Sequence, residues 1–178
     1  MFSQLTVAKR LALGFGLILS LMIAISLIGN QRVGFIDRTL TDVGDGAAVK
    51  QRYAINFRGS VHDRAIAIRD AVLVENDREL QRHLADIERL KGFYRDSAGP
   101  MDRMFREEGA NSRERELLAA IKEIQRRALT LTGDLLELRL AGEIDQARAF
   151  LLSDVSGAYS EWLKRVNAFI DYQEEVVT

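Results

Sequence analysis

The feature that most constrains this chain is an apolar residue at every third or fourth position through much of its length. Between residues 117 and 138 the pattern is unbroken, at Leu117, Ile121, Ile124, Ala128, Leu131, Leu135 and Leu138. A helix has about 3.6 residues per turn, so residues at this spacing share one face. A helix with one apolar face is stable only when that face packs on neighbouring helices at a shallow angle.

Three other stretches carry the same spacing, and none alternates as a strand does. Residues 50–74 place apolar side chains at Ala54, Phe57, Val61, Ala65, Ile68 and Val72. A second stretch begins near Asp77 and carries Leu80, Leu84, Ile87, Tyr94, Ala98, Met101 and Phe105. The last stretch begins near Ser156 and has Val155, Tyr159, Trp162, Val166, Phe169 and Val176 on one face. Four inward faces predict an all-α fold, an antiparallel up-down four-helix bundle.

Local signals predict where these helices begin and end. We expect N-caps at Asp77 and Ser112 and a helix end at Gly142, because short polar residues cap helices and glycine ends them. Pro100 should kink or split the second helix, since proline removes a backbone donor and clashes with the preceding turn. A short helix over 144–152, followed by a break, should precede the last helix.

A different signal precedes the bundle: residues 11–29 contain no charged side chain. At about 1.5 Å per residue, a helix of this length spans most of a hydrocarbon core of roughly 30 Å. A cleaved secretory signal is the alternative, but its apolar core is usually only about 7–15 residues long, and no A-x-A-like cleavage site follows here. We therefore predict a cytoplasmic tail (1–10), a transmembrane helix (11–29) and an extracytoplasmic domain (30–178).

The composition argues against several classes of function. A formal net charge of -1 offers no basis for nucleic-acid binding, and the absence of cysteine excludes disulfides and thiolate chemistry. Neither of the two histidines, His62 and His83, has a glutamate three residues before it, as a di-iron bundle would need. Motifs for phosphate loops, dinucleotides, zinc proteases and serine hydrolases are missing. We expect no enzyme, metal, cofactor or nucleic-acid partner.

The first bundle helix has cations within its apolar stripe. With about 100° per residue and Arg58 at 0°, the apolar residues of 55–73 fill an arc of roughly 180° centred near Arg58. Arg69 and His62 fall at about 20° and 40°, inside the arc, whereas Arg64 falls on the other, polar side. Charges in an apolar face are costly unless they are paired with an opposite charge or hydrogen-bonded. Three interpretations stay open: snorkelling arginines, ion pairs to a neighbouring helix, or a cluster that binds an anionic ligand.

The chain resembles the N-terminal part of bacterial methyl-accepting chemotaxis proteins that have a four-helix-bundle ligand-binding domain. The resemblance covers the basic tail, the first membrane helix, and the segments RGSVHDRAIAIRDAVL (58–73), AGEIDQARAFLLSDVSGAYSEW (141–162) and FIDYQEE (169–175). It implies a homodimer in the bacterial inner membrane with its main domain in the periplasm. It also implies a small organic acid or amino acid bound near the subunit interface, with small shifts of the last helix carrying the signal.

The resemblance also suggests site residues. In the aspartate-receptor branch, three arginines on the first helix, spaced by five and four, and a threonine at the start of the last helix hold the ligand. Here the arginines are spaced by six and five, and a serine stands three residues before the tyrosine, where that branch has its threonine. The candidate ligand site is Arg58, His62, Arg64, Arg69, Ser156 and Tyr159. Because the spacing differs, a di- or tricarboxylate or an aromatic acid fits this set as well as aspartate does.

Two other functions fit the same sequence. One is a non-catalytic, membrane-tethered bundle that dimerises or docks a partner protein, with Arg58 and Arg69 in structural ion pairs. The other is the sensor half of a histidine kinase or a cyclic-dinucleotide enzyme, since these carry similar bundles. In each case of signalling we expect a second membrane span and an output domain beyond Thr178.

Overall fold

The structure, a computed structural model, describes residues 7–107 and 109–177, with side chains described at 15–16, 18–23, 25, 46–107 and 109–176. It divides into two compact units, Met1–Asp45 and Gly46–Thr178, which are described separately. Helix α1 (Val7–Leu73) contributes to both units.

In the first unit, the described apolar side chains of α1 are more than half exposed: Phe15, Ile18, Leu19, Leu21, Met22, Ile23 and Ile25. Within the part of the chain that the structure describes, no helix has both the length and the apolar character needed to cross a membrane. The predicted tail (1–10), and parts of the predicted span (11–29), lie outside the residues whose side chains are described. Both stay predictions.

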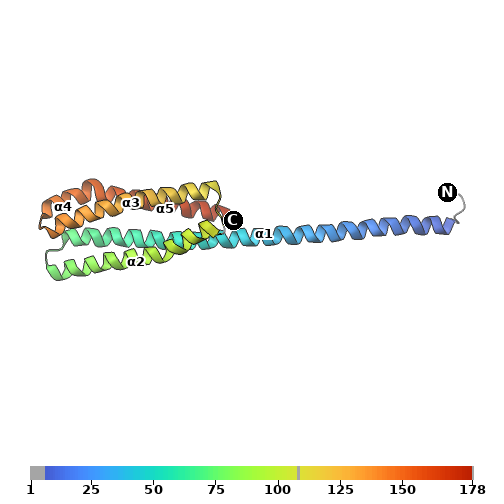
Figure 1. The fold of residues 1–178 in the computed structure, drawn as a ribbon, viewed down its shortest axis with the longest axis horizontal. Coiled ribbons are helices and arrows are strands. Elements are labelled where there is room, and N and C mark those ends of the chain that lie inside the picture. The colour runs from blue at the N-terminus through green and yellow to red at the C-terminus, as the bar shows by residue number, and fades with distance from the viewer. Residues whose placement is uncertain (1–6, 108, 178) are drawn as a thin grey trace. The chain divides into compact units, whose positions relative to one another are not determined.

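The second unit is helical throughout its described residues. From Gly46 onward α1 is followed by α2 (Asp77–Glu107), α3 (Ser112–Leu140), α4 (Ile144–Phe150), the π-helical turn η1 (Leu151–Val155) and α5 (Ser156–Val177). In Figure 1, α1, α2, α3 and the continuous α4–η1–α5 segment lie side by side and alternate in direction. The predicted all-α fold and the up-down four-helix bundle are confirmed for this unit.

The core of the bundle is built from the predicted apolar stripes. Most of the predicted side chains are buried, Val176 is exposed, and six are partly buried: Ala65, Leu84, Ala98, Phe105, Leu131 and Leu138. Aromatic rings fill the centre: Phe57 of α1 stacks on Tyr94 of α2 at 4.4 Å, and Tyr94 meets Trp162 of α5 edge-on at 5.4 Å. Large aromatic side chains of this kind contribute much of the burial energy of a small core.

The helix ends differ from expectation by single residues. Asn111, rather than Ser112, caps α3, and its side chain and that of Glu114 form a reciprocal capping box. Asn76 Oδ1 accepts a hydrogen bond from the Glu79 amide at 2.9 Å, so Asn76, rather than Asp77, caps α2. Gly142 ends the third helix as predicted, with a φ of 81° that glycine adopts readily.

Neither of the two expected interruptions ends a helix. Helix α2 passes through Pro100 without splitting, because buried residues on either side of the proline, including Tyr94 and Met101, hold the helix against the core. The break expected near Ser153 is instead a π-helical turn that joins α4 to α5 without a gap. A continuous apolar face packed on the core can therefore keep a helix intact at residues that would end an isolated helix.

A buried polar cluster ties three helices together at the end of the bundle where α5 finishes. Lys50 Nζ of α1 lies 2.9 Å from Glu114 Oε1 of α3, and Gln173 Nε2 of α5 donates to the same oxygen at 3.0 Å. Burial alone would raise the pKa of the Glu114 carboxyl. Hydrogen bonds from Lys50, Gln173 and the Asn111 backbone outweigh that effect, so the pKa lies below its ordinary value.

This cluster predicts an acid-sensitive fold. Because the folded-state pKa of Glu114 is depressed, its contribution to the free energy of unfolding is present above the ordinary glutamate pKa, about 4.3, and is lost as pH falls through the folded-state value. Glu114→Gln should cost about 3–5 kcal/mol at pH 7, since Lys50 is left buried without its carboxylate. Urea unfolding at pH 7 and pH 4 measures both effects.

The matched control is Glu116→Gln, which removes an exposed carboxylate paired with Arg113 on the same helix. Its cost should stay below about 1 kcal/mol. Equal losses in the two variants would show that the buried cluster does not hold the helices together.

Candidate functional site

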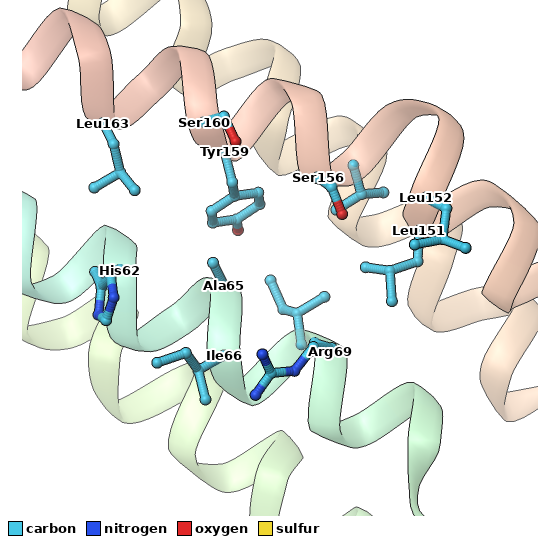
Figure 2. A pocket seen from close by; sticks show the side chains of 12 residues that line it. His62, Ala65, Ile66, Arg69, Leu151, Leu152, Ser156, Tyr159, Ser160 and Leu163 are labelled. Atoms are coloured by element: carbon cyan, nitrogen blue, oxygen red, sulfur yellow. The ribbon is translucent and has the colours of Figure 1, made fainter.

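A groove between α1 and the η1–α5 segment gathers most of the predicted site. Its cavity volume is about 270 Å³. The α1 wall consists of His62, Ala65, Ile66, Ile68 and Arg69, and the opposite wall of Leu151, Leu152, Val155, Ser156, Tyr159, Ser160 and Leu163. In Figure 2, Tyr159 points from α5 toward Ala65, and the guanidinium of Arg69 lies on the α1 side.

The structure brings together four of the six predicted residues: His62, Arg69, Ser156 and Tyr159 all line this groove. Arg58 lies beside it, in a neighbouring depression of about 350 Å³ that shares His62 and Leu163 with the groove. Arg64 lines neither space and sits in the core of the bundle. Nothing in the structure tests whether these residues bind a ligand, so the site stays a prediction.

The expected orientation of α1 was wrong. Arg58, His62 and Arg69 are exposed, whereas Arg64, assigned to the polar side, is buried. The apolar arc had merged two faces of the helix. The inner face includes Phe57, Ser60, Val61, Arg64, Ala67, Ile68 and Ala71, and the outer face carries Ile55, Ile66 and Leu73. Arg58 and Arg69 lie at the border between these two faces. An arc that covers both faces is therefore centred on these arginines.

The buried Arg64 is held by aromatic rings. Its guanidinium carbon lies 5.4 Å from the ring centre of Trp162 and 5.7 Å from that of Tyr94. Such cation–π contacts contribute about 0.5–2 kcal/mol each. Nη2 also makes a long hydrogen bond of 3.4 Å to Ser60 Oγ, whose own proton goes to the Leu90 carbonyl.

No ion pair among the described residues includes Arg64. Its Nε and the indole Nε1 of Trp162 both lack a hydrogen-bond acceptor within the described part of the chain. Burial lowers the pKa of Arg64, while Tyr159 and Tyr94 act in the opposite direction. A buried cation with so few partners is costly to the fold.

The exposed basic side chains of the groove, Arg69 and His62, each have an aspartate beside them. Arg69 donates from Nη2 and Nε to Asp70 Oδ1 at 3.1 and 3.2 Å. His62 Nδ1 lies 3.3 Å from Asp63 Oδ1. Both contacts are to the next residue of the same helix, which argues against the interpretation of Arg69 as a structural interhelical ion pair.

Tyr159 separates the groove from Arg64. Its hydroxyl is 3.0 Å from that of Thr132 on α3, and burial raises its pKa, so it stays a neutral phenol at ordinary pH. Its ring lies 5.7 Å from that of Trp162. A ligand in the groove would therefore touch a side chain that packs directly on the aromatic core.

Sequence analysis missed the apolar wall that η1 provides, formed by Leu151, Leu152 and Val155. A signal for it exists in the spacing of buried residues, because Ala147, Leu151, Val155 and Tyr159 follow one another at steps of four. Each such step turns an α-helix about 40° past a full turn, so three steps would rotate the face by about 120°. The wider π turn absorbs this drift and keeps all four residues inward. Turns of this type are frequent at functional sites.

The groove offers polar groups that can bind a ligand. Its polar groups are one guanidinium, one imidazole and three hydroxyls, in a mostly apolar lining. Among the described residues, no group of three metal-ligating side chains is close enough to hold an ion.

Comparison with known proteins agrees with this architecture. A family model described as a four helix bundle sensory module for signal transduction matches residues 4–178. No curated protein matches the chain.

The position of Arg64 predicts an unusual response to substitution. Arg64→Met fills similar space without a charge, so we expect the free energy of unfolding to rise by about 1–3 kcal/mol. Arg64→Ala leaves a cavity and should lower it by about 2–4 kcal/mol. Trp162, the single tryptophan, gives the fluorescence readout in urea titrations. A loss in Arg64→Met as large as in Arg64→Ala would mean that the buried charge itself stabilises the bundle.

Proposed function

The chain belongs to the four-helix-bundle sensory modules of signal transduction, and on that premise we propose that it is the sensor part of a methyl-accepting chemoreceptor that binds a small organic anion. The observation that carries the proposal is the groove between α1 and η1–α5. It unites His62 and Arg69 with Ser156 and Tyr159, residues nearly ninety positions apart in sequence. In this proposal the domain is a receptor without catalytic activity.

The groove suits an anion with an apolar part. A guanidinium can hold a carboxylate through two parallel hydrogen bonds, and Ser156 lies across the groove with a hydroxyl that can orient it. Pockets that bind small molecules combine an apolar lining with a few convergent polar groups. This arrangement supports the proposal over a purely structural role for the arginines.

Membrane attachment and dimerisation belong to the same proposal. Residues 11–29 would anchor the chain in the bacterial inner membrane, with the bundle in the periplasm, and the exposed apolar side chains of that segment support this. A second copy would cover the outer stripe of α1, where Ile55, Arg58, His62, Ile66, Arg69 and Leu73 recur every three or four residues and are exposed. The groove would then lie beside the subunit interface.

The signal would leave along α5. A ligand that bridges α1 and η1–α5 changes the position of α5 relative to α1, and α5 ends beside the Lys50–Glu114–Gln173 cluster. A ligand shifts such an equilibrium only by its difference in affinity for the two arrangements.

Thermal unfolding in the presence of carboxylates, amino acids and aromatic acids tests this function. A ligand that binds only the folded state stabilises by about 2.7 kcal/mol at a hundredfold excess over its dissociation constant. We expect one chemical class of anion to raise the unfolding temperature and Arg69→Ala to abolish that increase without lowering the melting temperature of the free protein.

The control is Arg89→Ala. Arg89 is also exposed and also donates from Nε and Nη2 to one aspartate oxygen, on Asp86, but it lies on α2 away from the groove. Its loss should leave ligand binding unchanged. Equal affinity in Arg69→Ala and the parent chain would show that the groove is not the site.

A further inference from the structure

Each basic side chain in the groove lining has a carboxylate beside it before any ligand arrives. Arg69 is paired with Asp70, and His62 lies beside Asp63. Among the described residues, Arg69 is the only arginine or lysine that lines the groove. Arg58 lies in the neighbouring depression, and Arg64 lies in the core against the rings of Trp162 and Tyr94.

The remaining wall is apolar and open to solvent. Leu152 is 76% exposed and Ile66 is 37% exposed, although both line a concave surface. Covering such side chains contributes about 25 cal/mol for each Å² of apolar surface removed from water. A second carboxylate placed against this wall would lose part of its hydration, and among the described residues the groove lining offers no second arginine or lysine to pair with it. A buried polar group without a partner costs about 1–3 kcal/mol.

We infer that the ligand of this groove carries a single carboxylate on a branched aliphatic or aromatic body, and that dicarboxylates bind more weakly. The inference rests on the proposed function and names the ligand class of the same site. The carboxylate lies at Arg69, near the hydroxyl of Ser156, and the apolar body lies along Ile66, Leu152 and Leu163. A cavity of about 270 Å³ limits the body to a few carbon atoms or one ring.

Two six-carbon acids test this directly on the full chain. Isothermal titration calorimetry compares 4-methylpentanoate with hexanedioate, an unbranched acid with the same number of carbons that ends in a second carboxylate, and phenylacetate supplies the aromatic monoacid. We expect at least one monoacid to bind about tenfold or more tightly than hexanedioate, as one unmet polar group predicts. Arg69→Gln should abolish the binding of the monoacid.

A second variant tests the apolar wall. Leu152→Ser removes an exposed side chain of the groove and should weaken monoacid binding about three- to tenfold, because apolar contact is lost. Leu140→Ser is the control, since Leu140 is 60% exposed and lies outside the groove lining. The affinity of the Leu140→Ser variant for the monoacid should equal that of the parent chain.

The possible failures are distinct. Hexanedioate binding as tightly as the monoacids, with loss in Arg69→Gln, overturns the inference and leaves the proposed function standing. Absence of heat with all three acids overturns the inference. If the wider set of carboxylates and amino acids also fails to stabilise a chain whose Trp162 fluorescence shows it to be folded, the proposed function fails as well.

Discussion

The packing of Arg64 against Trp162 and Tyr94 sets the rotation of α1 about its own axis, and the candidate site follows from that rotation. With Arg64, Ser60 and Val61 turned inward, Arg69 and His62 face outward at the border with α5. There they meet Ser156 and Tyr159 across a groove. A rotation by one residue, about 100°, would move this set of cations away from α5 and dissolve the site.

The apolar spacing was sufficient to predict the bundle, because every long helix has to bury one continuous face. The same spacing could not orient α1, since Ser60, Ala67 and Ala71 pack inward but carry little apolar signal. Arg64 could not be placed by a rule that sends charges outward, because its partners are aromatic rings contributed by two other helices. The prediction that Arg69, Ser156 and Tyr159 share one site came from a family resemblance. The packing of α1 against α5 explains how they come to line the same groove. The η1 wall of the groove could not be predicted, because residue helix propensities do not distinguish a π-helical turn from an α-helix.

A buried arginine without a carboxylate stabilises the bundle poorly, and a methionine would fill the same space at lower cost. Proteins often keep destabilising groups of this kind near functional sites. Arg64 lies next to Tyr159, which lines the groove. The Glu114 cluster differs in this respect. There the charges of Lys50 and Glu114 meet directly, Gln173 adds a hydrogen bond, and the result is a fixed point for the end of α5.

Helix α5 lines the groove near its first residues and carries Gln173 of the buried cluster near its last residues. The η1 turn directly precedes α5, at its groove end. The π turn absorbs the drift of four successive inward residues, so its winding determines which face α5 presents to the core. Leu151, Leu152 and Val155 of this turn also form one wall of the groove. A ligand that packs on them bears on the turn that sets the rotation of α5. A change of winding at η1 would therefore rotate α5 about its own axis, and at the other end of the helix that rotation acts on the hydrogen bond from Gln173 to Glu114.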